Sequence, residues 1–360
     1  MIINYQMLEK LFLLLLRKTS PEFSHKVAIL FLKYKIVLPK KKINNELLHT
    51  SLFGFKLKHP IGLAAGFDKN AEALSGLLKQ NFSFIEVGTV TPKKQSGNTK
   101  PRVFRLKKDQ SIINSLGFPN LGAEKVYQNL KKIRTSHTLG KEPIIGVNIG
   151  YNKDTKNPLQ DYQFCLKKFY SVADYITINI SSPNTPGLRS LQMKDKLEPL
   201  LKNISKTRKL LDKKIKRKIP LALKISPDLK ETDIKNISIL SHKYKFAAII
   251  ATNTTLSRDF KEKNIDNKHG GASGKVLYNR SNKTQIILNK YLNKNIEVIG
   301  VGGVDSAGCV IRKFNLGANA IQLYTSLVYK GLNSVDQILF DLIIKLEEKN
   351  KKTISSFIKK

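Results

Sequence analysis

Residues 175–187 read YITINISSPNTPG, a short apolar run that ends in a cluster of amide and hydroxyl side chains. The run at 175–180 does not alternate with polar residues, which is typical of a strand buried on both faces of a parallel sheet. Seven other runs of this kind occur, with segments of helical period such as 198–211 and 232–243 between them. The eight expected strands lie at 61–64, 84–88, 144–149, 175–180, 221–225, 247–251, 298–301 and 320–323.

Eight strand–helix units predict an α/β fold of the TIM (β/α)8 barrel type rather than an open doubly wound sheet. A chain of 360 residues is long enough to form one such barrel. An additional hairpin is expected from 103–106 and 111–114. The predicted domains are a helical annex at 1–42, the catalytic barrel at 43–345 and a basic C-terminal tail at 346–360.

The annex is expected to contain two short apolar helices. The first, at 7–18, places leucines and a phenylalanine at helical spacing. Ser20-Pro21-Glu22 then combines a capping hydroxyl, a proline at the first helical position and an acid in the first turn. The apolar run at 11–16 is too short to cross a bilayer. From these residues alone, a membrane-associating anchor, a helical hairpin docked on the barrel and a dimer interface are equally compatible.

The formal net charge is +37, and this high value has to be explained before any motif is interpreted. Only ten of the 64 basic residues are arginine, whereas recognition of bases and phosphates favours arginine. The lysines are scattered along the chain, so most of the charge is expected to be a solvated surface, and nucleic acid is not expected as a partner. Cys165 and Cys309 stand alone in the sequence, which predicts neither a metal site nor a disulfide framework.

Polar residues follow the expected strands, and in a TIM barrel the active site lies at this end of the strands. Loops rich in amide, ammonium and hydroxyl groups that converge there predict a pocket for a polar, anionic, planar ligand. Gly302-Gly303 and Thr325 fall where barrels commonly bind phosphate, although a tight turn also explains a glycine pair. These strand-end residues are 65–70, Thr89, Asn148, 179–184, Lys224, 252–254, 302–303 and 324–325.

Several of these runs resemble the dihydroorotate dehydrogenases. They are GLAAGFDK at 62–69, EVGTVTP at 86–92, NSLGF at 114–118, NISSPNTPG at 179–187, IATNTT at 250–255 and GVGGV at 300–304. The resemblance extends in order from about residue 51 to 331, and the annex resembles that of the membrane-associated, quinone-dependent class (class 2). It implies oxidation of (S)-dihydroorotate to orotate by an FMN-dependent enzyme of pyrimidine (UMP) biosynthesis, with a quinone as electron acceptor.

The resemblance also implies a catalytic role for Ser182. In the family its counterpart removes a proton from carbon 5 of dihydroorotate, while carbon 6 gives a hydride to the flavin. A serine hydroxyl is a poor base at its ordinary pKa, so a water-excluding lid and a relay through neighbouring hydroxyls or water are expected, with Thr185 as a candidate. The soluble classes have cysteine at this position, so Ser182 favours the quinone-linked class.

Other positions take their expected roles from the same resemblance. Lys69 pairs with the substrate carboxylate, the loop 114–118 covers the ring, and Lys224 lies near the pyrimidine edge of the flavin. The substrate contacts implied are Lys69, Asn114, Ser115, Leu116, Gly117, Phe118, Asn179, Asn184, Asn253 and Thr254. The FMN contacts implied are Ala65, Gly66, Phe67, Asp68, Lys69, Thr89, Asn148, Asn179, Lys224, Thr252, Gly274, Gly303, Tyr324 and Thr325. The quinone tunnel implied is lined by His25, Arg105 and Tyr324.

The partners implied are dihydroorotate or orotate, a membrane quinone and an anionic membrane surface that meets the N-terminal helices. The expected location is peripheral, on the cytoplasmic side of the inner membrane, and no dedicated protein subunit is expected. No GxGxxG fingerprint follows any strand, which agrees with an acceptor other than NAD. A soluble-type fumarate- or NAD-linked dihydroorotate dehydrogenase is the alternative within the family. A basic nucleic-acid-binding barrel is the alternative from another class.

Overall fold

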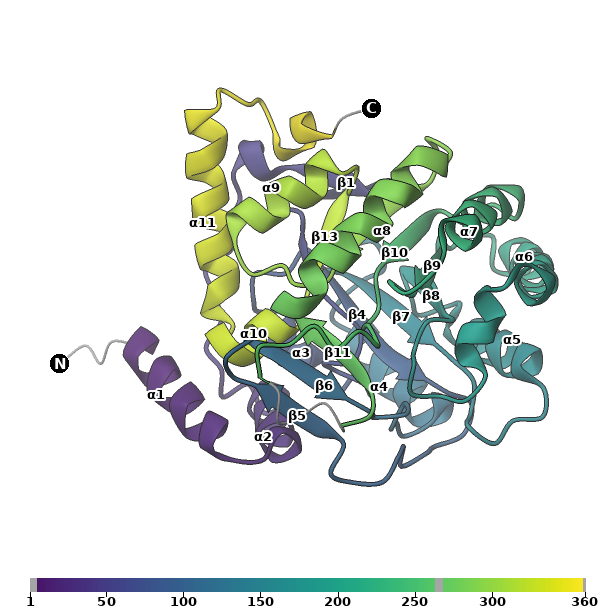
Figure 1. Ribbon diagram of the computed structural model, residues 1–360, viewed down its shortest axis with the longest axis horizontal. Helices are drawn as coiled ribbons and strands as arrows, with labels where there is room; N and C mark the ends of the chain where they lie inside the picture. Colours follow the sequence, from purple (N-terminus) through teal and green to yellow (C-terminus); the bar gives the residue numbers. More distant parts are fainter. Residues whose placement is uncertain (1–4, 263–267, 359–360) are drawn as a thin grey trace.

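The computed structural model describes residues 5–262 and 268–358, and its centre is a closed barrel of eight parallel strands (Figure 1). Strand β13 pairs with β3 and closes the barrel. The predicted TIM-barrel fold is therefore confirmed, and each expected strand lies within two residues of its expected bounds. In chain order the strands are β3 (Ile61–Leu63), β4 (Phe84–Val90), β7 (Ile144–Ile149), β8 (Tyr175–Asn179), β9 (Leu221–Ile225), β10 (Ala248–Ala251), β12 (Glu297–Val301) and β13 (Ala320–Leu323).

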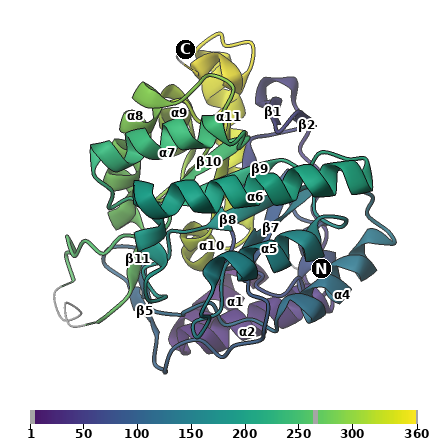
Figure 2. The same cartoon turned by 90° about the vertical axis from the view of Figure 1, so that its right-hand side faces the viewer.

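Helices surround the barrel, as Figure 2 shows for α5, α6 and α7. The segments expected at 198–211 and 232–243 fall inside α6 and α7, respectively. The α-helices of this layer are α3 (Leu74–Leu77), α4 (Ala123–Arg134), α5 (Pro158–Phe169), α6 (Lys194–Ile215), α7 (Glu231–Lys243), α8 (Tyr278–Tyr291), α9 (Ala307–Asn315), α10 (Thr325–Lys330) and α11 (Asn333–Glu348). Single 3-10 turns are η1 (Glu46–Leu48), η2 (Leu188–Gln192), η3 (Lys275–Leu277) and η4 (Ile354–Phe357).

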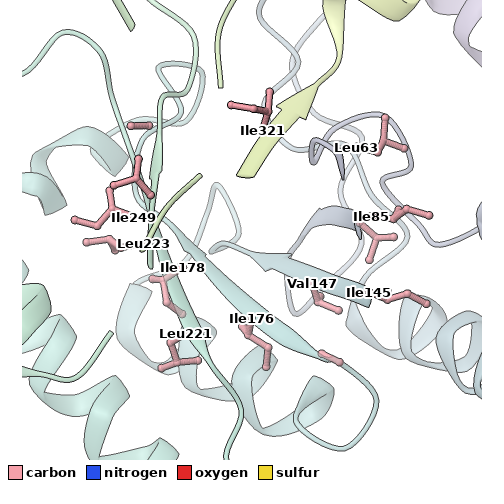
Figure 3. Close-up of a cluster of buried hydrophobic side chains, with 14 of the residues drawn as sticks. Leu63, Ile85, Ile145, Val147, Ile176, Ile178, Leu221, Leu223, Ile249 and Ile321 are labelled. Atoms are coloured by element: carbon pink, nitrogen blue, oxygen red, sulfur yellow. The ribbon is translucent and has the colours of Figure 1, made fainter. Parts of the chain in front are cut away.

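The main apolar core lies between the strands and this helical layer. Ile176 and Ile178 of β8, with Leu221 and Leu223 of β9, belong to this cluster and are inaccessible to solvent (Figure 3). Burial of a side chain of this size contributes about 1.5–3 kcal/mol to folding. The outward positions of the strands are thus apolar because each one faces a helix.

The inward positions of the strands divide the barrel interior into two zones. At the N-terminal end, a hairpin of β1 (Thr50–Leu52) and β2 (Phe55–Leu57) plugs the barrel, and the Phe53 ring lies 4.8 Å from that of Tyr175. Toward the C-terminal end the inward positions are polar, among them Glu86, Lys224 and Gln322. The strands are buried on both faces, as expected, but several of them, including β4, β9 and β13, carry a polar residue at an inward position.

A second sheet lies over the C-terminal end of the barrel. The expected hairpin is present as β5 (Val103–Leu106) and β6 (Ser111–Asn114). A third strand, β11 (Gly271–Gly274), pairs antiparallel with β6 and was not expected from the sequence. Its Gly-Ala-Ser-Gly sequence is unlike that of a typical strand, because glycine is depleted in strands.

The two expected N-terminal helices are present as α1 (Tyr5–Lys18) and α2 (Pro21–Lys33). The Ser20 hydroxyl accepts a hydrogen bond from the Phe23 backbone N–H, which confirms the predicted helix start. Helix α2 packs very closely on α3, because a Cβ built on Gly76 would lie 2.3 Å from the Leu32 carbonyl oxygen. Within the described residues, no helix combines the length and the hydropathy needed to cross a membrane.

The C-terminal segment packs on the barrel. Helix α11 ends at Glu348, so the domain boundary expected at residue 345 falls inside a helix. Ile354 and Phe357 of η4 are buried in the main core, and η4 contacts α9. Residues 1–4 of the expected annex and 359–360 of the expected tail lie outside the described ranges.

A buried histidine precedes the first barrel strand. The His59 Nδ1 accepts a hydrogen bond from the Ile61 backbone N–H at 3.3 Å. Burial, reinforced by the positive charges of Lys42 and Lys58, lowers the pKa of His59 from 6.5 to about 3. The folded protein therefore holds this imidazole in its neutral form.

This depressed pKa predicts a loss of stability in acid. Between pH 6.5 and pH 3 the unfolded chain binds a proton that folded His59 does not bind, so the free energy of unfolding falls as the pH falls. The contribution approaches about 1.4 kcal/mol per pH unit in the middle of this window, where the unfolded imidazole is protonated and the folded one is not. Urea titrations between pH 6 and pH 4 should show a shallower dependence for His59→Asn than for the wild type. Equal slopes would contradict the assignment.

Candidate active site

One cavity of about 1820 Å³ lies at the C-terminal ends of the barrel strands and continues between the barrel and helices α1 and α2. Sites for one small molecule usually measure roughly 300–1000 Å³, so this cavity has room for more than one ligand. Lys69, Ser182, Lys224 and Gly303 come from four different strand ends, and all four contribute to its wall. The fold thus brings together residues that are far apart in the sequence.

Most of the predicted site residues belong to this wall. Two do not: Ser115 lies in the loop that follows β6, where its backbone N–H donates to the Arg102 carbonyl oxygen, and Asn148 is buried behind Thr89. The predicted residues in the wall are His25, Ala65, Gly66, Phe67, Asp68, Lys69, Thr89, Arg105, Asn114, Leu116, Gly117, Phe118, Asn179, Ser182, Asn184, Lys224, Thr252, Asn253, Thr254, Gly274, Gly303, Tyr324 and Thr325.

A buried carboxylate organises the floor of the site. Glu86 projects from β4 into the barrel and is inaccessible to solvent. Its Oε1 accepts a hydrogen bond from Asn148 Nδ2 at 2.7 Å. Its Oε2 accepts from the Tyr175 hydroxyl at 3.0 Å, the Thr177 hydroxyl at 3.1 Å and Gln322 Nε2 at 2.9 Å. Four donors from three other strands therefore converge on one side chain.

This carboxylate sets the orientation of the asparagine amides above it. Because Asn148 Nδ2 donates to Glu86, Asn148 Oδ1 faces the other way and accepts from Thr89 Oγ1 at 2.6 Å and Asn179 Nδ2 at 3.1 Å. Asn179 Oδ1 in turn accepts from the Ser181 hydroxyl at 2.9 Å. Each amide is thus held in one orientation by the residue below it, so the site presents defined donors and acceptors.

Lys224 places a cation in the same floor. It projects from β9 into the cavity wall, and within the described part of the chain its Nζ has no hydrogen bond or ion pair. Burial lowers the pKa of Lys224, and the negative charge of Glu86 opposes that shift. A buried ammonium without a protein acceptor is costly, so the site is suited to a ligand that brings an acceptor or a negative charge.

Lys69 lies where the barrel meets the annex. Its Nζ donates to the Gly66 carbonyl oxygen at 2.7 Å and is 3.5 Å from His25 Nε2. Burial lowers the pKa of Lys69 to about 8. Burial and the Lys69 charge together lower the pKa of His25 to about 3, so His25 is neutral at physiological pH. The His25 ring is 5.5 Å from that of Phe67, which is 5.9 Å from that of Tyr324.

Ser182 lies in the loop after β8 and is almost completely buried. Its Oγ accepts a hydrogen bond from the Asn184 backbone N–H at 3.2 Å. No carboxylate or imidazole hydrogen-bonds to this hydroxyl within the described chain. The Asn184 side chain donates to Asn114 and so joins the Ser182 loop to the hairpin. The hydroxyls of Thr185 and Thr254 are buried and have no protein partner among the described residues.

The part of the cavity that is lined by Gly274, Gly302 and Gly303 is suited to a phosphate group. Gly274, Gly302 and Gly303 have φ values of +93°, +114° and +69°, respectively, and a Cβ on Gly303 would lie 2.6 Å from that of Tyr278. Such close packing requires glycine and leaves backbone N–H groups accessible to an anion. The Thr325 hydroxyl, at the start of α10, is directed to the same place and donates to Ser273 at 2.8 Å.

Three predicted site residues have structural partners as well. The Tyr324 hydroxyl donates to the Gly66 carbonyl oxygen at 3.2 Å. The Asp68 carboxylate accepts from three backbone N–H groups of its own loop, including that of Ala73. Arg105 donates to the Thr19 carbonyl oxygen and the Ser24 hydroxyl, both at 2.7 Å. Arg105 therefore ties the hairpin to the annex.

Sequence reasoning missed three residues of the site. Glu86 and Gln322 are single polar residues inside apolar strands, and that isolation was the available signal. Ser273 belongs to β11, which had no strand signal. Their roles depend on side-chain positions that only the closed barrel defines.

Fold and site together define a TIM-barrel protein with a large polar cavity at the C-terminal ends of its strands, a cavity suited to a ligand that carries negative charge. The family model for dihydroorotate dehydrogenase matches residues 47–346. The chain belongs to the dihydroorotate dehydrogenase family.

Individual relatives agree with this assignment. A protein of Bartonella tribocorum named dihydroorotate dehydrogenase (quinone) is 44% identical over 330 residues, which cover 91% of this chain and 90% of the relative. The protein of Rhizobium etli with the same name is 42% identical over 313 residues, covering 87% and 85%. The crystal structure of DHODH from Eimeria tenella in complex with ferulenol superimposes with a TM-score of 0.88 at 33% identity, covering 94% of each chain.

The four donors around Glu86 predict the effect of replacing it with glutamine. A glutamine side chain has one acceptor atom in place of two, so at least one buried donor loses its partner, at a cost of about 1–3 kcal/mol. Urea denaturation should show this loss for Glu86→Gln and no comparable loss for Glu348→Gln, which changes an exposed glutamate at the end of α11. Equal stability of the two variants would contradict the role of Glu86.

Proposed function

We propose that this protein oxidises (S)-dihydroorotate to orotate with bound FMN and transfers the electrons to a membrane quinone, a step of UMP biosynthesis. The observation that carries this proposal is the continuity of one cavity from the Ser182 loop, past Lys224, to helices α1 and α2. Such a cavity gives substrate and acceptor separate approaches to one cofactor. The quinone-named relatives support a quinone over fumarate or NAD as the acceptor.

The donor set supports FMN as the cofactor. When bound, FMN supplies the hydride acceptor for the substrate and the electron carrier for the quinone. Lys224 would stabilise negative charge on the reduced ring. The ring would be held by Ala65, Gly66, Phe67, Asp68, Lys69, Thr89, Asn179 and Thr252, with Asn148 acting from behind Thr89. The phosphate would be held by Gly274, Gly303, Tyr324 and Thr325.

The substrate would bind between the loop 114–118 and the Ser182 loop. Lys69 supplies a cation for the carboxylate, and the asparagine amides offer both donors and acceptors to the ring N–H and C=O groups. The loop 114–118 covers this part of the cavity and excludes water. The substrate residues proposed are Lys69, Asn114, Ser115, Leu116, Gly117, Phe118, Asn179, Asn184, Asn253 and Thr254.

Ser182 is the proposed base. Because no carboxylate or imidazole binds its hydroxyl, the proton has to leave through other hydroxyls or water. Thr185 is buried and its hydroxyl has no protein partner among the described residues, which suits a relay. Burial of the site keeps bulk water from competing for the proton.

The annex at 1–42 is the proposed quinone and membrane unit of the barrel domain. Leu11, Leu15 and Phe23 are more than half exposed, so the annex presents apolar side chains to its surroundings. An anionic lipid surface would also attract the basic ends of its helices. His25, Arg105 and Tyr324 line the proposed quinone path, and the proposed location is peripheral, on the cytoplasmic side of the inner membrane.

A steady-state comparison of electron acceptors tests the function. Purified protein is expected to be yellow and to reduce a quinone analogue with dihydroorotate far faster than it reduces fumarate or NAD. A protein lacking residues 1–39 is expected to lose the quinone reaction preferentially, because the proposed quinone path is lined by α1 and α2. A folded protein that takes up no FMN, or that prefers fumarate, would overturn the proposal.

A substitution of Ser182 tests the proposed base. Ser182→Ala should retain FMN and lose at least about 99% of turnover, since general acid–base catalysis contributes roughly 10²–10⁴-fold. Ser182→Cys should retain part of the activity, because a thiol is more acidic than a serine hydroxyl and can also exchange a proton. Flavin content and the melting temperature serve as controls for folding. Turnover of Ser182→Ala at the wild-type rate would remove Ser182 from this role.

A further inference from the structure

Lys313 is a buried lysine that the proposed reaction does not use. It lies on α9, is inaccessible to solvent, and its Nζ donates a hydrogen bond to the Ser281 hydroxyl of α8 at 2.7 Å. Within the described residues, no carboxylate lies within ion-pair distance of this ammonium. Gln285 of α8 is uncharged and donates to the Lys313 carbonyl oxygen.

A lysine in this position has an energetic cost. Moving an ammonium out of water without an opposite charge is unfavourable by several kcal/mol, and proteins seldom retain such a group without a compensating interaction. Burial lowers the pKa of Lys313 to about 7, and the neighbouring Cys309 opposes this shift only in part. The site is therefore suited to a negative charge that the polypeptide does not itself provide.

Lys313 lies behind the loop at 302–303 of the proposed phosphate site, here called the glycine loop. The Ser281 hydroxyl that accepts from Lys313 donates to the Val301 carbonyl oxygen. The next residue, Gly302, packs on Ser281 so closely that a Cβ on Gly302 would lie 2.9 Å from the Ser281 hydroxyl. One side chain thus separates the ammonium from the backbone that precedes Gly303.

The lysines that are more exposed near this loop are already engaged. Lys330 and Lys275 bind the same carboxylate, that of Asp305, at 2.9 Å and 3.5 Å, respectively. Their charges are therefore compensated in part by Asp305, and they are also screened by solvent. Among the described residues, Lys313 has no carboxylate partner, and its burial excludes screening by solvent.

We infer that Lys313 is the buried counter-charge of the FMN phosphate and a positioning residue for the glycine loop. It acts through Ser281 and the backbone at 301–303 without touching the phosphate. This inference rests on the proposed function, because it requires a phosphorylated flavin in this cavity. It assigns to Lys313 a contribution to the preference for FMN over riboflavin, which lacks the phosphate.

A consequence of this placement is proton uptake on binding. A nearby phosphate dianion favours the protonated lysine, so the pKa of Lys313 should rise from about 7 when FMN binds. At pH 8 the flavin-free protein would then take up a proton with FMN but not with riboflavin. Because Cys309 opposes the pKa shift of Lys313, Cys309→Ser serves as a control variant in this measurement.

The test compares FMN and riboflavin binding to the full chain after removal of its flavin. The variants are Lys313→Met, Lys313→Gln and Lys313→Arg, with Lys283→Gln as the matched control, because Lys283 is an exposed lysine on the helix that carries Ser281. Flavin fluorescence should show FMN affinity lower by about tenfold or more for the Met and Gln variants, the size expected for a charge pair inside a protein. Riboflavin affinity should be unchanged, and Lys313→Arg and Lys283→Gln should bind both flavins like the wild type.

The outcomes separate this inference from the proposed function. A wild-type chain that binds neither flavin overturns the proposed function itself. A wild-type chain that prefers FMN, with Met and Gln variants that keep the same preference, overturns only the role of Lys313. An equal loss of FMN and riboflavin affinity indicates a merely structural role and also overturns it. If the Met and Gln variants do not fold, calorimetry of FMN and riboflavin binding to the flavin-free wild type, at pH 8 in two buffers, measures the proton uptake instead. Equal proton uptake with both flavins contradicts the inference.

Discussion

The convergence of four hydrogen-bond donors on Glu86 is the interaction on which the site depends. The apolar plug lies below this carboxylate and the asparagine amides lie above it, in successive layers of one barrel. Glu86 therefore separates the apolar part of the barrel interior from the polar part that faces the cavity. A buried network of this kind is stable when its donors and acceptors find partners, and among the described residues Gln322 Oε1 is a member atom without one. The orientations of Asn148, Thr89 and Asn179 follow from that requirement, and they determine which polar atoms a ligand meets.

The same barrel separates two kinds of surface along each strand. Outward positions such as Ile178 and Leu223 stabilise the fold by packing under the helices, whereas the adjacent inward positions Asn179 and Lys224 serve the site. Because these roles alternate residue by residue, the fold can present lysine and amide groups in its interior without weakening the apolar layer. The glycines at 274 and 302–303 follow a different principle, in which the absence of a side chain leaves the backbone itself accessible from the cavity.

Much of this organisation could be predicted from the sequence, for physical reasons. The eight strands were recognisable because short apolar runs bounded by polar loops are typical of strands in a parallel barrel. The barrel topology places the C-terminal ends of all its strands at one face, so residues such as Ser182 and Lys224 had to lie at the same site. The strand β11 could not be predicted, because its stability comes from pairing with β6 and its residues have low strand propensity. The sequence could not show that Ser115 and Asn148 lie outside the cavity wall, nor that Lys313 is buried. Both results depend on the direction that each side chain takes in the packed structure. In a sequence this rich in lysine, no sequence pattern distinguishes one buried lysine from the many solvated ones.

The hairpin of β5 and β6 has a further consequence. Arg105 of β5 donates to the backbone of the annex, while β6 runs directly into the loop 114–118, and the two residues at that end of the hairpin, Val103 and Asn114, are paired. The hairpin thus connects the annex at one place to the loop 114–118 at another. A displacement of the annex would therefore be transmitted through the hairpin to the loop 114–118, so under the proposed function contact with a bilayer and entry of the substrate would be coupled.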